Sequence, residues 1–371
     1  MQDSKVLFFI NSLGGGGAER VCVNLLNGFY KKGFDVSLLV LNLNKRVFFE
    51  EINKNINFFN LDVAHTRGAF LKLGKFVLEN DFKVILVFNY QLAILLILLR
   101  DILFLDYKII VRNINTLSLL YKKENSFWHK YFVNSLTKFF YKRADLIIAQ
   151  SDGMKKDLIK NYFIPYEKVI TINNPVSKKI EDFAKSIDYI KFPKRYEVLF
   201  VGSLTEKKGV FYLLEAFSLI HKKDSKLMLR IVGEGELKSK LLEFCKDLKI
   251  EKNVIFEDFT PDIAIYYLKA RLTLLTSLYE GFPNVLIESL TLGTPVVAFD
   301  CPSGPSEIIE NGKNGYLVKY LDVKAFSETV LKALERDFDQ KSVAMTALKY
   351  KNENILQEYI KVVKKFLWQS K

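Results

Sequence analysis

The sequence is poor in the residues that build disulfide frameworks and most metal sites. It contains three cysteines and three histidines among 371 residues. Cys22, Cys245 and Cys301 lie far apart without metal-ligand spacing, so they give no disulfide framework and fit a reducing compartment. The histidines also lack ligand spacing, and no serine or cysteine can be placed beside one of them. Nucleophilic catalysis therefore has little support.

Long apolar runs are also missing. The most apolar stretch, residues 84–99, is interrupted at residues 89–91, which leaves an unbroken run of eight residues at 92–99. A membrane-spanning helix needs about 20 apolar residues, so we expect a buried strand, a turn and a buried helix. No cleavable signal pattern precedes the strand-like residues 6–10. We therefore expect a cytoplasmic protein.

The common nucleotide-binding fingerprints are absent as well. Residues 6–10 are a continuous apolar run typical of a covered parallel strand, and the glycine-rich turn at 14–17 leads into a helix-like pattern from Ala18. No G-x-G-x-x-G or Walker sequence fits there, and no acidic ribose ligand follows the second strand at 36–41. A loop at a helix N-terminus suits phosphate or sugar oxygens, but a flexible tight turn explains four glycines equally well.

Basic and aromatic residues are abundant, and the formal net charge is +13. Such a charge favours anionic partners: nucleotides, phosphates or the anionic face of a membrane. Residues 121–143 interleave lysines with aromatic residues, as in a helix that lies on a membrane or an ordinary amphipathic helix whose lysines snorkel. Base usage in the source genome explains the lysine content equally well. No nucleic-acid-binding signature is present, and we expect no nucleic-acid partner.

Short apolar runs alternate with helix-like segments, and the pattern restarts after a charged, weakly periodic section. This alternation predicts an α/β fold with two doubly wound domains. We expect the first domain at residues 1–177, a linker at 178–195 and the second domain at 196–345. A C-terminal helix within 346–371 is expected to pack back on the first domain. In such pairs the ligand lies where the carboxyl ends of both sheets meet.

Two glutamates eight positions apart mark the most informative stretch. Glu280 lies in a loop with glycine and proline, and Glu288 lies in a helix that we expect to begin near Pro283. Free amides at that helix start would hold a phosphate between two carboxylates that accept from sugar hydroxyls. This arrangement suits binding of a sugar nucleotide better than glycoside hydrolysis, in which two carboxylates flank a single bond. The amides in question belong to Asn284, Val285 and Leu286.

A lysine in another loop completes this hypothesis. Lys208, within the glycine-bounded loop at 202–209, is a natural cation for a diphosphate leaving group, although a loop lysine in so basic a protein is often a solvated charge. Asp337 and Asp339 resemble a metal-binding pair, but they lie in a charged segment remote from the other motifs. We therefore expect no metal.

These motifs resemble the retaining glycosyltransferases of GT-B family 4, particularly bacterial enzymes that build capsule, lipopolysaccharide or lipid-linked oligosaccharides. The resemblance implies two Rossmann-like domains and metal-independent transfer of a hexosyl or N-acetylhexosaminyl group, with retention of configuration. It implies a nucleotide sugar as donor, a UDP-sugar in our expectation, and no cofactor. The implied acceptor is a lipid-linked or lipopolysaccharide-type saccharide, with the enzyme peripheral on the inner face of the cytoplasmic membrane. The matching segments are residues 12–20, 145–151, 173–176, 202–209, 233–235 and 280–318.

The resemblance also assigns roles to residues. It places Glu288 on the nucleotide ribose and Glu280 beside the transferred sugar, with Lys208 on the diphosphate, so Glu280 and Lys208 are the candidate catalytic residues. The glycine loop is implied to close over the donor. The donor-binding residues are expected to be Gly15, Gly16, Gly17, Gly202, Ser203, Lys208, Gly233, Phe259, Gly281, Phe282, Asn284, Val285, Leu286 and Glu288.

Two positions depart from the family pattern. Ser203 stands where the family usually has an arginine paired with the lysine, so either Arg112 or Lys207 compensates or the donor binds more weakly. Asn89 stands where many members carry a histidine, so we assign no catalytic histidine. Asn89 and Arg112 are candidates for the acceptor or sugar side.

Two other hypotheses remain open from the sequence. A sugar-nucleotide epimerase could share the architecture, but it would need side-chain acids or bases that a histidine-poor sequence hardly offers. A non-catalytic binder of membranes or polyanions could use the same basic surface, and salt-sensitive binding without nucleotide dependence would identify it.

Overall fold

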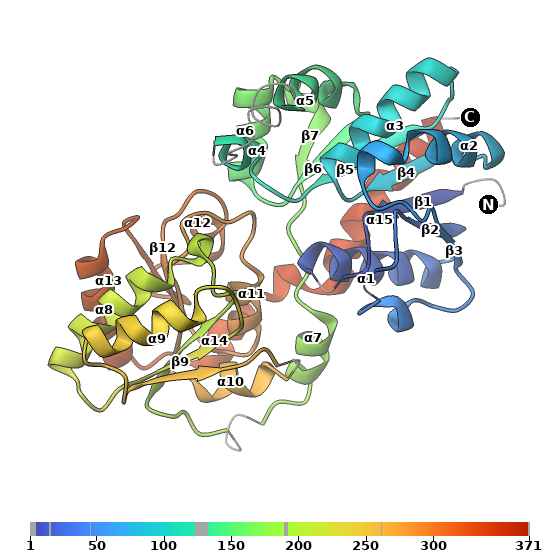
Figure 1. Cartoon of the computed structure of the whole chain (residues 1–371). Coiled ribbons are helices and arrows are strands. Elements are labelled where there is room, and N and C mark those ends of the chain that lie inside the picture. The colour runs from blue at the N-terminus through green and yellow to red at the C-terminus, as the bar shows by residue number, and fades with distance from the viewer. Residues whose placement is uncertain are drawn as a thin grey trace. The chain divides into compact units, whose positions relative to one another are not determined.

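The computed structural model describes residues 5–14, 16–44, 46–122, 133–188, 192–260 and 262–369 (Figure 1). The chain divides into two compact units, one formed by residues 1–175 with 352–371 and the other by residues 176–351. Each unit contains its own parallel sheet. The predicted α/β class with two doubly wound domains is therefore confirmed.

The first unit is built on a seven-stranded sheet with the order β3-β2-β1-β4-β5-β6-β7, in which every strand pairs parallel to its neighbours. Most of its strands are short and fully buried because helices cover both faces. The strands are β1 (Val6–Ile10), β2 (Val36–Val40), β3 (Asn57–Asn60), β4 (Val84–Val87), β5 (Lys108–Asn113), β6 (Leu146–Ala149) and β7 (Val169–Thr171).

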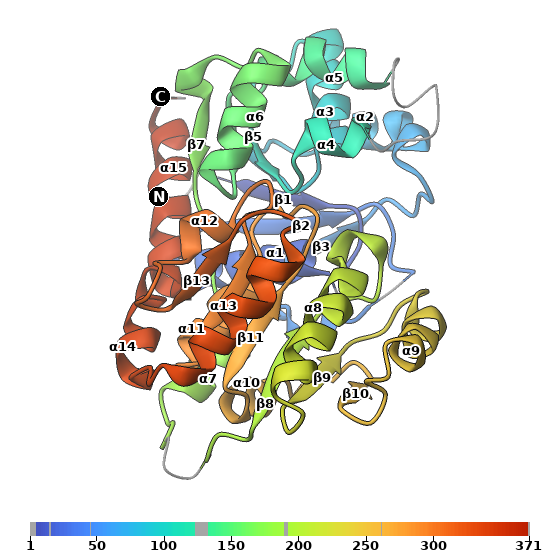
Figure 2. The ribbon, with the colours of Figure 1, turned by 90° about the vertical axis from the view of Figure 1, so that its left-hand side faces the viewer.

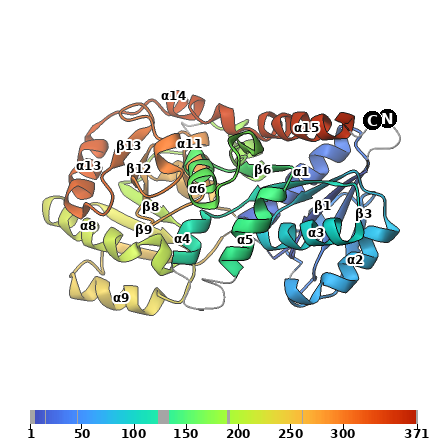
Figure 3. The same ribbon diagram turned by 90° about the horizontal axis from the view of Figure 1, so that it is seen from above.

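Helices of the first unit form a layer on each face of this sheet. One face packs against α1 and α15, which contact each other (Figure 3), and the other packs against α2, α3 and α6. Alternate strand residues belong to the two cores, as the pleat requires. The helices are α1 (Gly17–Lys31), α2 (Phe70–Glu79), α3 (Tyr90–Leu103), α4 (Leu117–Lys122), α5 (Asn134–Phe140), α6 (Asp152–Tyr162) and α15 (Asn352–Gln369).

The second unit is built on a six-stranded parallel sheet with the order β10-β9-β8-β11-β12-β13. On one face α8 and α13 lie side by side (Figure 2), and α9 completes that layer. The other face packs against α7, α10, α11 and α14. The strands are β8 (Glu197–Val201), β9 (Met228–Val232), β10 (Val254–Glu257), β11 (Leu272–Leu275), β12 (Val296–Phe299) and β13 (Gly315–Val318). The helices are α7 (Lys178–Ala184), α8 (Val210–Lys223), α9 (Lys238–Asp247), α10 (Ala264–Lys269), α11 (Asn284–Thr291), α12 (Pro305–Ile308), α13 (Val323–Glu335) and α14 (Gln340–Met345).

The segment predicted as a linker, residues 178–195, needs correction, because it contains α7. The Ser177 side chain caps this helix by accepting from the amide of Ile180 at 3.3 Å. Ile180 is buried in the core of the second unit, and charged residues occupy most of the outer positions. The division between the units falls instead after Pro175, and the chain rejoins the first unit at Asn352.

Within the ranges that the structure describes, no helix combines the length and the apolarity needed to cross a bilayer. The apolar stretch at 84–99 forms β4, a turn and part of α3, as its interruption by polar residues predicts. Leu92, Leu96 and Ile97 are fully buried against the sheet. The apolarity of this stretch therefore serves the core of the first unit.

Candidate functional site

Two loops at the carboxyl edge of the second sheet bring Lys208 and Glu280 together. The loops follow β8 and β11, which are neighbours in the sheet. The Nζ atom of Lys208 lies 2.6 Å from Oε1 of Glu280, and Ser277 Oγ donates to the same oxygen at 2.6 Å. An ion pair thus forms between two residues that lie 72 positions apart in sequence.

Glu280 is an ionised carboxylate in a buried position. Its side chain is only 7% exposed. Burial alone would raise its pKa, but the charges of Lys208 and Lys207 and the hydrogen bonds from Lys208 and Ser277 outweigh that effect and hold the pKa below its usual range. At neutral pH this group can accept hydrogen bonds, and it has no proton to donate.

Glycine allows the loops to approach each other this closely. The turn Glu206–Lys208 ends at Gly209, whose φ is +60°, and a Cβ there would lie 2.2 Å from the carbonyl oxygen of Thr276. At Gly233 the φ is +149°, and a Cβ would lie 2.0 Å from the oxygen of Gly202. Larger residues at either position would push the loops of neighbouring strands apart.

The start of α11 differs from the prediction in one detail. The helix begins near Pro283 as expected, with Pro283 as its N-cap residue, but the amide of Leu286 donates to the carbonyl oxygen of Pro283 at 3.1 Å. The expectation that this amide is free is wrong, because an i to i+3 bond closes the first turn. The side chains of Leu286 and Phe282 are buried, and the Phe282 ring packs edge-on against Tyr350. The side chains at these two positions therefore serve the core of the second unit.

Glu288 lies on α11 and is 8% exposed. The hydroxyl of Tyr267, a fully buried residue of α10, donates to Oε2 of Glu288 at 3.2 Å. Neither Tyr267 nor Ser277 was among the residues predicted from the sequence. Ser277 lies three positions before Glu280, which is a usable signal, whereas nothing in the sequence connects Tyr267 with Glu288.

The remaining predicted donor-site residues of this unit occupy the same carboxyl edge. Gly202 and Ser203 follow β8, and Ser203 is exposed. Phe259 follows β10 with 68% of its surface exposed, and its amide lies 3.4 Å from a carboxylate oxygen of Glu234. Lys207 Nζ lies 3.9 Å from Glu280 Oε2 and 5.0 Å above the Tyr279 ring. This unit therefore contains a second cation beside Glu280.

Comparison with known proteins identifies the chain. Residues 15–179 match the family described as Glycosyltransferase Family 4, and residues 182–351 match Glycosyl transferases group 1. The Campylobacter jejuni N-acetylgalactosamine-N,N'-diacetylbacillosaminyl-diphospho-undecaprenol 4-alpha-N-acetylgalactosaminyltransferase is 30% identical over 383 residues, which cover 93% of this chain and 99% of that enzyme. The chain is a glycosyltransferase of the group 1 and family 4 type.

Solved structures extend the comparison to the fold. Anabaena HepE in complex with UDP gives a TM-score of 0.79 at 18% identity and covers 97% of this chain and 100% of that one. The lipopolysaccharide outer core galactosyltransferase WaaB, in its apo form, gives 0.78 at 18% identity and covers 97% and 99%. The predicted GT-B fold is therefore confirmed. Family membership favours sugar transfer over the epimerase and the non-catalytic binder.

In the first unit of the glycosyltransferase, the predicted residues that the structure describes lie at the start of α1 and near the ends of β4 and β5. Gly16 and Gly17 are exposed at the start of α1, while Gly15 lies outside the described residues. Asn89 is the N-cap of α3, and its Oδ1 accepts from the amide of Gln91 at 2.7 Å. Arg112 is 1% exposed, so its guanidinium lies inside the first unit.

The surroundings of Arg112 explain its burial. Its Nη2 donates to Oδ1 of Asn174 at 2.6 Å, and its guanidinium lies 5.7 Å above the Phe88 ring. Both neighbours also follow strands of the first sheet, β7 and β4. The arginine therefore ties three strand ends together inside the first unit, and Lys207 is the better candidate to replace the missing family arginine.

The described residues of the glycosyltransferase contain no group of three or more histidine, cysteine, aspartate or glutamate side chains that could hold a metal ion. Asp339, one member of the aspartate pair noted in the sequence, caps α14 by accepting from the amide of Ser342 at 2.7 Å. The spacing of this pair thus reflects a helix start.

Proposed function

We propose that this glycosyltransferase transfers a hexosyl or N-acetylhexosaminyl group from a UDP-sugar to a lipid-linked saccharide in bacterial glycan assembly, with retention of configuration and without a metal. The Lys208–Glu280 pair, at the sheet edge where the helix that carries Glu288 begins, is the observation that carries the proposal. The name of the Campylobacter jejuni relative states an undecaprenol-linked acceptor, and HepE has also been solved with UDP-glucose.

Lys208 and Lys207 would bind the donor diphosphate. An ammonium group has three N–H donors, so Lys208 can keep its bond to Glu280 while it donates to a phosphate oxygen. The positive charge beside the diphosphate stabilises the negative charge that develops when the sugar leaves. Glu280 holds the lysine in place and accepts from a sugar hydroxyl.

Glu288 would bind the ribose of the donor. Its carboxylate is fixed by Tyr267 from the neighbouring helix, and ribose hydroxyls are natural donors to it. The exposed Phe259 ring, beyond the end of β10, offers a flat apolar surface on which a nucleotide base can stack.

Retention follows from front-face attack in this proposal. The bond between the anomeric carbon and the phosphate oxygen breaks, the acceptor oxygen bonds to the same face, and the acceptor proton passes to the leaving phosphate. A catalytic acid or base works best with a pKa near the working pH. The depressed pKa of Glu280 makes it a poor proton carrier, and its bonds to Lys208 and Ser277 make it a poor nucleophile.

A transfer assay tests the proposal. The protein is incubated with single UDP-sugars and a polyprenyl-linked saccharide, with and without chelator, and product configuration is determined by NMR. We expect one UDP-sugar to be used equally in both conditions, and Glu288→Ala to raise the donor KM. Lys222→Ala, on an exposed position of α8, serves as the matched control. Donor turnover without any acceptor would favour the epimerase, and inhibition by the chelator would refute metal independence.

Exposed aromatic residues of the first unit support a peripheral membrane position. Phe104 and Phe163 end α3 and α6 in the left-handed conformation, with φ of +54° each, and are 93% and 73% exposed. Both helices lie on the same face of the sheet and run back toward its amino edge. Glycine is the usual residue at such a position, so an exposed phenylalanine there costs stability without a folding benefit. Nearby, Lys155 lies 4.1 Å above the ring of the exposed Tyr166.

Replacing both phenylalanines with glycine separates membrane binding from folding. The double variant Phe104→Gly, Phe163→Gly is expected to be at least as stable as the wild type, because glycine accepts positive φ without strain. Sedimentation with anionic phospholipid vesicles should show binding weakened by about tenfold or more, since each ring loses about 1.5–3 kcal/mol of apolar burial. Met345→Ser, an exposed apolar position of the second unit, is the control. Equal vesicle binding of all three proteins would contradict this membrane surface.

A further inference from the structure

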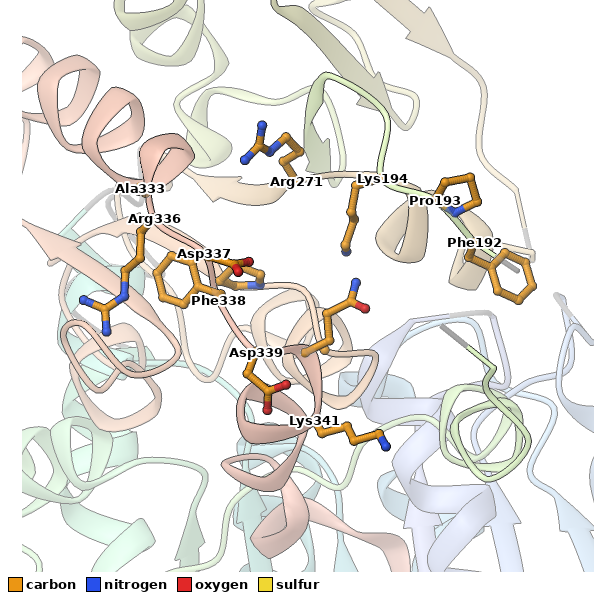
Figure 4. A pocket seen from close by; sticks show the side chains of 13 residues that line it. Phe192, Pro193, Lys194, Arg271, Ala333, Arg336, Asp337, Phe338, Asp339 and Lys341 are labelled. Carbon is orange, nitrogen blue, oxygen red and sulfur yellow. The ribbon is translucent and has the colours of Figure 1, made fainter. Parts of the chain in front are cut away.

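A pocket of about 670 Å³ lies in the second unit, at the amino edge of its sheet (Figure 4). Lys194, Arg271 and Pro295 line it, and they precede β8, β11 and β12, three adjacent strands. Its other wall is residues 336–339, which connect α13 to α14, together with Gln340 and Lys341 of the first turn of α14. The loops that carry Lys208 and Glu280 follow β8 and β11, so the pocket and the candidate donor site lie at opposite edges of the same strands.

The lining of this pocket is predominantly cationic. Four cationic side chains and two carboxylates contribute to it, which leaves an excess of two positive charges (4 − 2). Asp339 is already engaged as the cap of α14. The aromatic rings of Phe192 and Phe338 supply apolar surface. The charged residues are Lys194, Arg271, Arg336, Lys341, Asp337 and Asp339.

Lys194 extends into this space from the segment before β8 (Figure 4). Its Nζ donates to the hydroxyl of Thr294 at 2.6 Å, and no carboxylate of the described residues lies within 4.0 Å of it. Burial and the neighbouring charge of Arg271 lower the pKa of Lys194 to about 7. The hydrogen-bond partner of the Lys194 ammonium is thus a neutral hydroxyl, which does not balance its charge.

The two arginines of the lining also have neutral partners in the described structure. Arg271 donates to the carbonyl oxygen of Leu334 at 2.8 Å and lies 5.6 Å from the Tyr196 ring. Arg336 lies 5.2 Å from the ring of Phe338. These contacts orient the guanidinium groups without cancelling their charge. An anion that enters the pocket would therefore meet a net positive lining, because the two aspartates offset only part of the charge of the four cationic side chains.

We propose that this pocket binds the phosphate group of a small phosphorylated molecule, with the Lys194 ammonium as the principal contact. The volume falls within the range of about 300–1,000 Å³ typical of small-molecule sites and exceeds what a lone oxyanion needs. The rings of Phe192 and Phe338 would then face the organic part of the ligand. The site is independent of the proposed donor site, and nothing in the transfer scheme uses it.

Protonation of Lys194 should be linked to binding of the anion. The charged form of the lysine binds the anion better, so affinity rises as pH falls through about 7. The other charged groups that line the pocket are arginines, Lys341 and two aspartates, and none of these types ordinarily titrates between about pH 6 and 8. The pH dependence therefore reports on Lys194.

Calorimetric titration with sulfate provides the test, because sulfate stays a dianion across this range. Ionic strength is held constant with chloride. We expect the wild type to bind about tenfold more tightly at pH 6 than at pH 8, following the protonated fraction of a group with a pKa near 7. Lys194→Met should lose about tenfold or more at pH 6. Lys194→Arg should keep the affinity and lose the pH dependence, since arginine stays protonated.

Two controls locate the binding. Lys324→Met, an exposed position of α13 outside the pocket, and Lys208→Ala should both bind sulfate as the wild type does. Unchanged affinity in Lys194→Met, or pH dependence that persists in Lys194→Arg, would overturn the proposal. Sulfate binding that disappears in Lys208→Ala would also overturn it, because the ion would then occupy the candidate donor site. Thermal unfolding of each variant shows that the fold is retained.

Titration with glucose 1-phosphate and with inorganic phosphate distinguishes the two sources of the phosphate group. Tighter binding of glucose 1-phosphate, lost in Lys194→Met, supports a phosphorylated small molecule as the ligand. Equal affinity for both probes would overturn that part of the proposal and leave a site for the free ion. If neither probe binds, the site itself is refuted.

Discussion

The carboxyl edges of the two sheets use polar residues in different ways. In the second unit, loops after β8 and β11 place Lys208 and Glu280 in an ion pair whose members are partly or fully buried. In the first unit, Asn89 caps a helix and Arg112 is buried against Asn174. One edge thus holds charged groups that a ligand can contact, whereas at the other edge Asn89 and one guanidinium nitrogen of Arg112 are engaged by the fold.

This difference indicates where the chemistry of the donor resides. A diphosphate needs cations close to the surface, and Lys207 and Lys208 are partly exposed, with side-chain exposures of 35% and 17%. A guanidinium as buried as that of Arg112 supports the first sheet. We therefore expect mutations at the two edges to separate into effects on transfer and effects on stability.

The largest expected effect is on transfer, from Lys208→Ala. Loss of one preorganised hydrogen-bond donor to developing negative charge lowers kcat by about 10²–10³-fold, and we expect a loss of at least that size for a charged donor. Lys207→Ala should cost about tenfold less, because Lys207 lies 3.9 Å from Glu280 and is more exposed. Steady-state kinetics with the preferred UDP-sugar measure both values. Equal effects of the two substitutions would remove the distinction between a principal and an auxiliary lysine.

The next effect concerns the stability of the second unit and its dependence on pH. The lowered pKa of Glu280 means that its stabilising contribution is fully present above the ordinary glutamate pKa of about 4.3 and is lost as pH falls through its own lower value. Glu280→Gln should therefore cost about 2 kcal/mol at neutral pH and progressively less in acid. Denaturant unfolding at a series of pH values measures this difference. A constant difference across that series would mean that Glu280 is not charged in the folded protein.

Much of this edge could be predicted from the sequence because turn residues mark it. Gly209 and Pro283 punctuate loops that follow apolar strands, and this pattern is enough to place Lys208 and Glu280 at one sheet edge. Tyr267 could not be predicted, because its bond to Glu288 depends on how two helices pack. The bond within the first turn of α11 that occupies the amide of Leu286 depends on local geometry that a periodic pattern does not contain.

Some secondary-structure elements also could not be predicted from the sequence pattern. The central strands were predictable as continuous buried runs, but the edge strand β3 (Asn57–Asn60) carries two asparagines and is only half-buried, so it gives no such run. The helix α7 was not predicted, because its lysines and acidic residues outnumber its apolar residues and leave no clear helical periodicity. Asn89 and Arg112 were considered functional from their place in the family pattern, and packing shows that both have structural partners.

The smallest expected effect comes from Asn89, and it tests the first-unit side of the comparison. Asn89→Ala removes the side-chain acceptor for the amide of Gln91 and should cost about 1 kcal/mol in the free energy of unfolding. Asn89→Ser should restore most of it, because serine caps nearly as well. Both variants should keep the wild-type kcat/KM for donor and acceptor. A different result would be that Asn89→Ser restores stability while transfer to the acceptor stays impaired. The side-chain amide of Asn89 would then contact the substrate, and the carboxyl edge of the first sheet would take part in the reaction.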